Sequence, residues 1–153
     1  MPQISSGKGG WATNPYPHGL ELETVTSAVQ QAAKLLNLAR VPIVILNGFC
    51  FMFKKSLIDS IGNFDKDNFP LGYGEEVDFS LRSHQAGFKA YVVPAVYLYH
   101  EKTASFSEKS KKDQKSVANQ VLKSKYKNEL KVAGDFVKST TTPQMEAFRQ
   151  LIS

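Results

Sequence analysis

The sequence predicts an α/β fold in which a few short strands are flanked by helices. Apolar residues recur at spacings of three and four in several segments, which is typical of amphipathic helices. Between these segments lie short, continuous apolar runs of strand length. The runs are too few for a complete doubly wound sheet, so an α+β arrangement stays open as an alternative. With 153 residues, 42% of them hydrophobic and 22% charged, the chain has the composition of one soluble globular domain.

The first predicted helix follows a loop. Residues 1–19 are rich in Gly, Ser, Pro and Asn, which favour turns over regular structure. Residues 21–38 are predicted to form a helix, because apolar side chains recur along one face. That face comprises Val25, Ala28, Val29, Ala32, Leu35 and Leu36.

Four short apolar runs are predicted to be extended. They cover residues 41–46, 48–53, 89–93 and 95–100. Asn47-Gly48, between the first two runs, suits either a tight turn or a bulge where a ligand approaches the backbone. The single cysteine, Cys50, lies within FCFMF and is expected to be buried as a small apolar side chain.

Two further helices are predicted on either side of a loop at residues 63–74. One covers residues 54–61 and stops at Gly62, and the other covers residues 75–86 and stops at Gly87. Glycine commonly closes a helix because it adopts positive φ without steric cost. Both helices are therefore expected to end at these glycines.

The positive charge of the chain is concentrated in one segment. Between Lys102 and Lys131, nine lysines accompany three acidic residues. The lysines are not interleaved with arginines and stacking aromatics, which argues against nucleic acid as a partner. A solvated amphipathic helix is the default interpretation, and an anionic membrane surface stays open as an alternative partner.

The same segment is predicted to be helical from about residue 107. Its thin apolar stripe comprises Val117, Val121, Leu122 and Tyr126. Residues 140–143, of sequence TTTP, predict a break before a last helix over residues 144–152.

Several classes of protein are excluded by the sequence. One cysteine cannot form an internal disulfide framework, and the longest apolar run, residues 41–53, is too short to cross a bilayer. The first ten residues lack the apolar region of a secretory signal, so we expect a cytoplasmic protein. The motifs GxSxG, HExxH, CxxC and GxxxxGK do not occur. A calcium loop starting at Asp65 is rejected, since Phe69 and Pro70 replace its required oxygen ligand and glycine.

The stretch GYGEEVDFSLR, residues 72–82, has two interpretations. Acidic residues in a first helical turn complement the helix dipole, and Asp78 and Arg82 have the spacing of a helical ion pair. Alternatively, Gly72-Tyr73-Gly74 forms a flexible turn, and the aromatic ring of Tyr73 stacks on a flat ligand such as a sugar. Adjacent carboxylates then follow, one of which has a pKa raised by its neighbour and can accept a proton.

Three stretches in order along the chain resemble the C-terminal half of the catalytic domain of family 2 glycosyltransferases, which have the GT-A fold. NGFCFMFKKSLIDSIGNFD resembles that family's apolar strand, short helix and GxFD turn. GYGEEVDFSLRSHQAGF resembles its acidic helix, and KAYVVPAVYLYH resembles its paired strands that end in a histidine. The resemblance implies a partial GT-A fold and an inverting transfer of sugar from a nucleotide-sugar donor to an acceptor hydroxyl. A glycan or lipid-linked acceptor in the synthesis of cell-envelope polysaccharide is implied as well.

The resemblance also implies residues of an acceptor site. Glu76 matches the general base that deprotonates the acceptor hydroxyl, although Glu75 stays open for this role. Glu75 and Asp78 match acidic positions that orient the base or bind acceptor hydroxyls. Gly48 and Tyr73 match positions in the acceptor pocket.

On the donor side the resemblance is less complete. His100 matches a ligand of a divalent metal, Mn²⁺ or Mg²⁺, that holds the donor diphosphate. Lys102, Thr103 and Ser105 match a loop that closes over the diphosphate. No Asp-x-Asp motif precedes Leu46, so we expect the donor-binding half to lie outside this chain. The segment alone is then expected to be inactive and to lack the metal.

The expected organisation has two parts. Residues 1–106 would form the acceptor-side portion of a glycosyltransferase domain, and residues 107–153 a lysine-rich helical extension. Apolar runs at residues 41–46 and 91–99 would be left uncovered, which predicts self-association or disorder near the N-terminus. A non-catalytic binding or assembly module of the same fold is the alternative function. A basic adaptor at the inner surface of a membrane is a further alternative.

Overall fold

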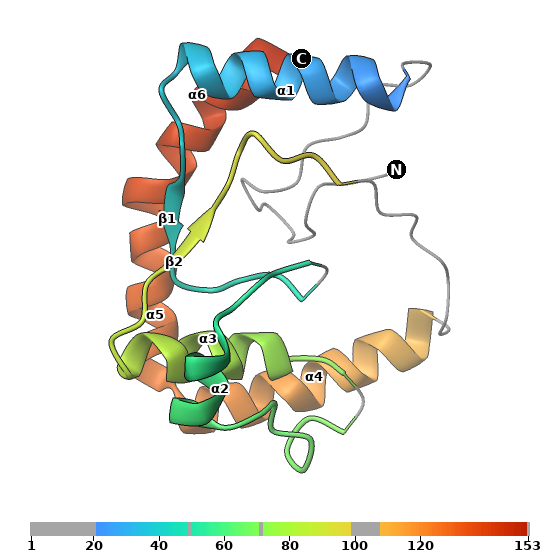
Figure 1. Ribbon diagram of the computed structural model, residues 1–153. Helices are drawn as coiled ribbons and strands as arrows, with labels where there is room; N and C mark the ends of the chain where they lie inside the picture. Colours follow the sequence, from blue (N-terminus) through green and yellow to red (C-terminus); the bar gives the residue numbers. More distant parts are fainter. Residues whose placement is uncertain (1–20, 49, 71, 99–107, 153) are drawn as a thin grey trace. The chain divides into compact units, whose positions relative to one another are not determined.

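The computed structural model describes residues 21–152 except Phe49, Leu71 and residues 99–107. The described chain is mostly helical, with a small two-stranded antiparallel sheet (Figure 1). Its elements are α1 (Leu22–Leu35), β1 (Val41–Ile43), α2 (Lys55–Ile61), α3 (Glu75–Gln85), β2 (Ala90–Val92), α4 (Glu108–Lys125), α5 (Lys127–Phe136), the π-helix η1 (Val137–Thr141) and α6 (Thr142–Ile152). The expected α/β class is thus met only loosely, because helices predominate and the described residues contain one two-stranded sheet. None of the described helices combines the length and the apolar character needed to cross a bilayer.

The described residues divide into two compact units. The first draws on residues 21–43, 91–98 and 136–152, and the second on residues 44–90 and 108–135. The lysine-rich helices α4 and α5 therefore belong mostly to the same unit as α3. This division differs from the boundary expected at residue 106. The difference arises because α4 packs against α3, a long-range contact that the sequence alone does not reveal.

In the first unit, α1 packs against α6 through one apolar face. Val25, Val29 and Ala32 of α1 are buried as the periodicity predicted. Ala33, which was not on the predicted face, is buried as well, whereas Ala28 is exposed. Leu35 was assigned to the same face but is 76% exposed. The helix ends at Leu35, and Asn37 then turns the chain with a positive φ of 53°, so Leu35 lies beyond the packed surface.

The predicted break at residues 140–143 is wrong, because α5 continues through η1 into α6. The chain widens into a π-turn there, and the N–H of Thr142 donates to the carbonyl of Val137, five residues back. This wider turn comes immediately before Pro143, whose nitrogen has no hydrogen to donate. The hydroxyl of Thr141, which is fully buried, donates to the carbonyl of Pro42 in β1 over 2.8 Å.

The strands are shorter and fewer than predicted. The run at 41–46 is a strand only over β1, and the run at 89–93 only over β2. The described parts of 48–53 and 95–100 are neither strand nor helix. Within the described residues only β1 and β2 pair with each other, so these runs have no strand to bond with. Cys50 is exposed, so its predicted burial is wrong as well.

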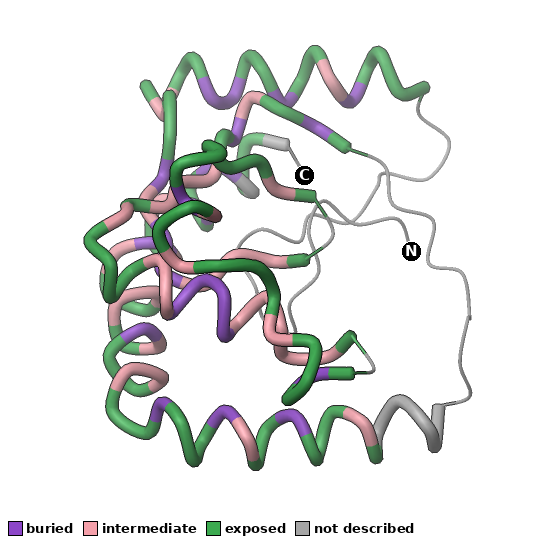
Figure 2. The backbone as a smooth tube through the Cα atoms, turned by 60° about the horizontal axis from the view of Figure 1, so that its bottom comes forward, coloured by how far each residue is buried: buried purple, intermediate pink, exposed green. Residues whose placement is uncertain are grey.

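In the second unit, one side of α4 carries buried residues and the other is exposed (Figure 2). The buried positions Ala118, Leu122 and Tyr126 follow a four-residue spacing. Val117 was expected on this stripe but is 60% exposed, because Ala118 holds the position that faces the core. The other predicted helix ends are confirmed, since α2 stops before Gly62 and α3 stops before Ala86-Gly87, and both glycines have positive φ.

Candidate functional site

The first turn of α3 begins at a glycine that no other residue could replace without strain. Gly74, the N-cap, has a φ of 91°. A Cβ atom at this position would lie 3.0 Å from the ring of Phe69 and 3.2 Å from Cβ of Ala118. The α4 helix therefore packs directly against the entrance of α3. This close packing fixes where the carboxylates of Glu75 and Glu76 emerge.

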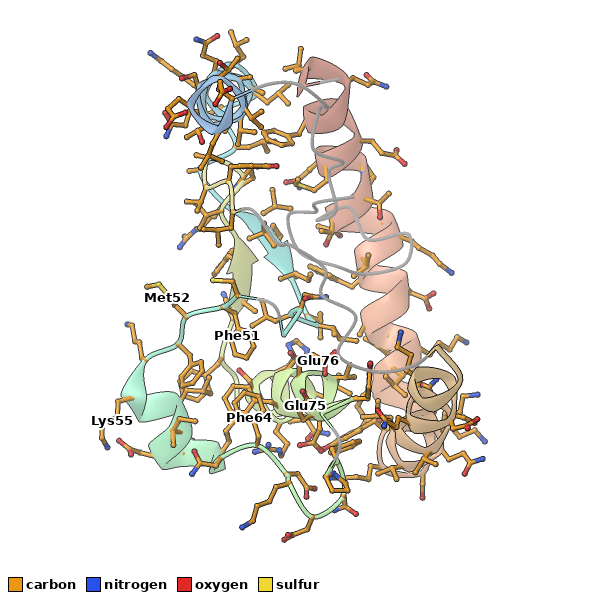
Figure 3. The ribbon with its side chains drawn as sticks, turned by 90° about the vertical axis from the view of Figure 1, so that its right-hand side faces the viewer. Phe51, Met52, Lys55, Phe64, Glu75 and Glu76 are labelled. Carbon is orange, nitrogen blue, oxygen red and sulfur yellow. The ribbon has the colours of Figure 1, made fainter. Side chains whose placement is uncertain are left out.

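Two residues of the expected acceptor site, Gly48 and Glu76, lie against each other. A Cβ atom on Gly48 would be 3.5 Å from Cβ, 3.7 Å from Cγ and 4.0 Å from the carboxyl carbon of Glu76. The backbone after β1 thus runs along the Glu76 side chain. Figure 3 shows Glu76 beside Glu75 at the start of α3.

Ser80 holds this backbone in place. Its hydroxyl accepts a hydrogen bond from the N–H of Leu46 over 3.0 Å and donates to the carbonyl of Glu76 over 2.6 Å. Ser80 is buried, so the two bonds tie the chain just before Gly48 to the first turns of α3. No pattern in the sequence indicates this role, since a serine inside a helix usually has only local partners.

Glu76 has an elevated pKa. Burial is the main cause, because the half-buried side chain loses water that would stabilise its charge. The neighbouring carboxyl of Glu75 raises the pKa further, while the backbone N–H groups of Glu76 and Gly74 partly oppose the shift. The Oε2 atom of Glu75 is itself buried, with no hydrogen-bond partner among the described residues. The arrangement therefore favours a carboxylate at position 76 that accepts a proton readily.

Tyr73 contributes an aromatic ring at the same entrance. Its side chain is half-buried, and the ammonium of Lys115 on α4 lies 5.4 Å from the ring centroid. This distance is within the range of a cation–π contact. Lys115 was not singled out in the sequence, where it is one of many lysines. The contact places a positive charge of the lysine-rich helix next to the Tyr73 ring.

Asp78 is fully buried and accepts hydrogen bonds from three side chains. Its Oδ2 accepts from Nε of Arg82 over 2.7 Å, which confirms the predicted helical pair. Its Oδ1 accepts from Nζ of Lys125 and from the hydroxyl of Tyr126, each over 2.6 Å. The carboxylate therefore joins α3 to the end of α4.

These bonds perturb the pKa of each partner. Burial alone would raise the pKa of Asp78, but its bonds to Lys125, Tyr126 and Arg82 outweigh that effect and lower it. Burial would lower the pKa of Lys125, yet its bonds to Asp78 and Asp65 raise it. Burial and the bond to Asp78 together raise the pKa of Tyr126 to about 12. The network is thus most stable with Asp78 charged, Lys125 charged and Tyr126 neutral.

The network extends to the loop between α2 and α3. Lys125 also bonds Oδ2 of Asp65 over 2.9 Å, and Asp65 accepts two further bonds from Asn68. The bond from Lys125, followed by those from Asn68, lowers the pKa of Asp65. Arg82 donates to the carbonyls of Ile61 and Asn63 at the start of this loop. The loop before the Gly72–Gly74 turn is therefore tied to both helices.

The expected site residues thus fall into three groups. Gly48, Tyr73, Glu75 and Glu76 gather around the entrance of α3. Asp78 points into the unit, and both its oxygens are bonded to side chains of the protein. This geometry makes Asp78 an internal anchor.

The third group, the expected donor-side residues His100, Lys102, Thr103 and Ser105, lies outside the described residues. In the part of the chain that is described, no three His, Cys, Asp or Glu side chains gather closely enough to hold a metal ion. The chemical groups that come together at the entrance of α3 are the carboxyl groups of Glu75 and Glu76 and the aromatic ring of Tyr73. They are suited to proton transfer at Glu76 and to stacking at Tyr73.

Sequence reasoning missed three residues that shape the site: Ser80, Lys125 and Tyr126. Each acts through a contact more than thirty residues away along the chain. Tyr126 was identified only as part of an apolar stripe.

Comparison of the chain with protein-family models, curated proteins and solved structures finds no match.

Proposed function

We propose that this chain is the acceptor-side part of an inverting glycosyltransferase, with Glu76 as its general base. The observation that carries the proposal is the position of Glu76 at the entrance of α3. Its side chain lies against Gly48, and its pKa is raised by burial and by Glu75. A carboxyl group with a raised pKa is better matched to accepting a proton from a hydroxyl.

The surroundings of Glu76 support binding of a sugar hydroxyl. Gly48 has no side chain, so it places main-chain atoms directly beside Glu76. Tyr73 offers a ring against which the apolar face of a sugar can stack, and Lys115 lies next to that ring. The Oε2 atom of Glu75 is a buried acceptor whose hydrogen-bond donor is not supplied by the described residues.

In this proposal the reaction is a single displacement. The acceptor hydroxyl loses its proton to Glu76 while its oxygen forms a bond to the anomeric carbon of the donor sugar. The bond from that carbon to the nucleoside diphosphate breaks, and the diphosphate leaves with the electron pair. A divalent metal, when bound on the donor side, would stabilise the negative charge of the diphosphate. Asp78 has no contact with the acceptor in this scheme and fixes α3 instead.

Binding of acceptor sugars to the chain tests the proposal first. Methyl glucoside, methyl mannoside, methyl rhamnoside and N-acetylglucosamine would be titrated into the ¹⁵N-labelled chain and followed by amide NMR. We expect saturable shifts at Gly48 and over Tyr73–Glu76 with at least one sugar, lost in Tyr73→Ala. Lys55→Gln, an exposed change on α2, should leave the shifts unchanged. Absence of saturable shifts at these amides with every sugar would overturn the acceptor site.

Sugar transfer tests the base itself. In a chain that joins these residues to a donor-binding half, Glu76→Gln should abolish transfer and leave nucleotide-sugar binding intact. Asp59→Asn, an exposed carboxylate on α2, is the matched control and should keep both activities. Transfer that persists in Glu76→Gln but disappears in Glu75→Gln would move the base to Glu75. Transfer that persists in both variants would contradict a carboxylate base at this site.

A further inference from the structure

The segment Phe51–Phe53, between the turn at Gly48 and helix α2, has the features of a β-strand without a partner. The chain runs there without helical turns, and Lys54 at its end has φ −73° and ψ 145°, in the extended region (Figure 1). Aromatic residues and their neighbours in FCFMF favour strands. Among the described residues, none forms a backbone hydrogen bond with Phe51, Met52 or Phe53.

Side chains along this segment alternate as they do in a strand. The rings of Phe51 and Phe53 both lie near Phe79 of α3, at centroid distances of 6.2 Å and 5.3 Å. Met52, between them, is 94% exposed and points away from the two labelled phenylalanines, Phe51 and Phe64 (Figure 3). Alternation of this kind gives the segment one face on the core and one free face. Its backbone edges form no hydrogen bonds with the part of the chain that the structure describes.

The apolar surface around this segment continues beyond it. Phe64, whose ring stacks on Phe79 at 4.6 Å, is 37% exposed, and Phe53 is 43% exposed. Apolar side chains are thus exposed on both sides of the segment, Met52 on its free face and Phe53 and Phe64 near Phe79. Exposed apolar side chains, together with unbonded backbone groups, form a template for another strand.

We propose that Phe51–Phe53 pairs with the same segment of a second copy of this chain, antiparallel and centred on Met52. In this register Phe51 of each copy lies opposite Phe53 of the other, which gives two aromatic cross-strand pairs. Lys54 lies opposite Cys50, so the lysines of the two copies stay at opposite ends of the paired segment. A parallel pairing would instead place the Lys54 side chains beside each other. Such like-charged neighbours would repel, so the two-fold antiparallel arrangement is favoured by charge.

The proposal is independent of the glycosyltransferase assignment, because it uses no residue of the acceptor site. It extends the general expectation of self-association to a defined segment, register and symmetry. It also differs from the sequence-based expectation in location, since that expectation concerned residues 41–46 and 91–99. Phe51–Phe53 lies in the second unit, next to α2 and α3.

Sedimentation velocity over a range of micromolar concentrations tests the association. We expect the wild-type chain to show a concentration-dependent dimer, and Met52→Lys to remain monomeric. Met52 is exposed, so this substitution should not disturb folding, which circular dichroism would check. Val132→Lys, an exposed apolar change on α5, is the matched control and should dimerise like the wild type. A wild-type monomer at all concentrations, or a Met52→Lys variant that still dimerises, would overturn the proposal.

Disulfide trapping tests the register. Residues directly opposite each other in an antiparallel pair have Cα atoms about 4.5 to 5.5 Å apart, which suits a disulfide. The variant Cys50→Ser/Met52→Cys should therefore form a covalent dimer on mild oxidation, and Cys50→Ser/Val132→Cys should not. Equal cross-linking of the two variants would overturn the register. A monomer that binds anionic lipid vesicles or an unrelated apolar peptide through Met52 would also overturn the self-pairing.

Discussion

The hydroxyl of Tyr126 donates a 2.6 Å hydrogen bond to Oδ1 of Asp78, a residue 48 positions earlier in the chain. Both groups are buried, and the same oxygen accepts a bond from Lys125. The end of the lysine-rich helix α4 is thereby attached to the helix that carries Glu75 and Glu76. Removal of these bonds should loosen the two helices together.

Tyr126→Phe should destabilise the chain while leaving its apolar packing intact. The change removes one hydrogen bond to a buried carboxylate, an interaction that is worth about 1.5–3 kcal/mol. Urea unfolding followed by circular dichroism would measure the difference. Lys55→Met provides the control, because its ion pair with Asp59 is exposed and contributes at most about 1 kcal/mol. Equal losses of unfolding free energy in the two variants would show that the Asp78–Tyr126 bond stabilises the chain no more than an exposed ion pair does.

The stability conferred by Asp78 should depend on pH. Its pKa and that of Asp65 are lowered by folding, so their contribution is complete above the ordinary pKa of 3.8 and is lost as the pH falls below it. Asp78→Asn should therefore cost most at neutral pH and progressively less as the solution becomes acidic. Unfolding free energies of both proteins over a pH series would measure this. A difference that stays constant down to about pH 3 would contradict the charged network.

The same network should weaken in alkali. The pKa values of Lys125 and Tyr126 are raised by folding, to about 12 in the case of Tyr126. Their contribution is complete below the ordinary values of 10.5 and 10.0 and is lost as the pH rises through the folded values. The alkaline arm of the pH series should thus be shallower in Tyr126→Phe than in the wild type.

Gly74→Ala should be more destabilising than Gly87→Ala. Both glycines have positive φ, which costs an alanine about 1–2 kcal/mol. At Gly74 the added methyl group also meets neighbours, at 3.0 Å from Phe69 and 3.2 Å from Ala118, whereas at Gly87 no described atom lies within 4 Å of it. The close contact should add about 1–3 kcal/mol. Thermal unfolding of the two variants would measure the difference in their stability. Equal losses of stability would contradict close packing of α4 against the first turn of α3.

Local patterns in the sequence predicted the helices well. Apolar periodicity and closing glycines located α2 and α3 to within a residue or two, because helices are determined largely by nearby residues. The Asp78–Arg82 pair was predictable for the same reason. The acidic first turn of α3, seen in the sequence as a candidate site, does lie beside Gly48.

Long-range relationships were not predictable. The runs at 48–53 and 95–100 have strand composition, but a strand also needs a partner, and within the described residues only β1 and β2 find one. The roles of Lys125 and Tyr126 depend on the burial of Asp78, which no spacing in the sequence reveals. The break expected at Pro143 failed because a π-turn at η1 accommodates the proline.

Glu76→Gln should stabilise the chain at neutral pH. Folding raises the pKa of Glu76, so its contribution is favourable below the ordinary pKa of 4.5 and is lost as the pH rises through the folded value. At neutral pH the ionised carboxylate is therefore a cost to stability, which the neutral amide removes. Unfolding midpoints should be higher for the variant at neutral pH and similar to the wild type at about pH 4. A lower midpoint at neutral pH would show that the charge is stabilising.

Titration of the Glu76 carboxyl group decides whether this residue can be the base, because the proposed base must hold its proton more tightly than an ordinary glutamate. Carbon-13 NMR of the side-chain carboxyl groups, assigned with Glu76→Gln, would follow its ionisation. We predict a pKa above the ordinary 4.5, moving back toward that value in Glu75→Gln. A Glu76 pKa at or below 4.5 in the folded wild-type chain would contradict the proposed base.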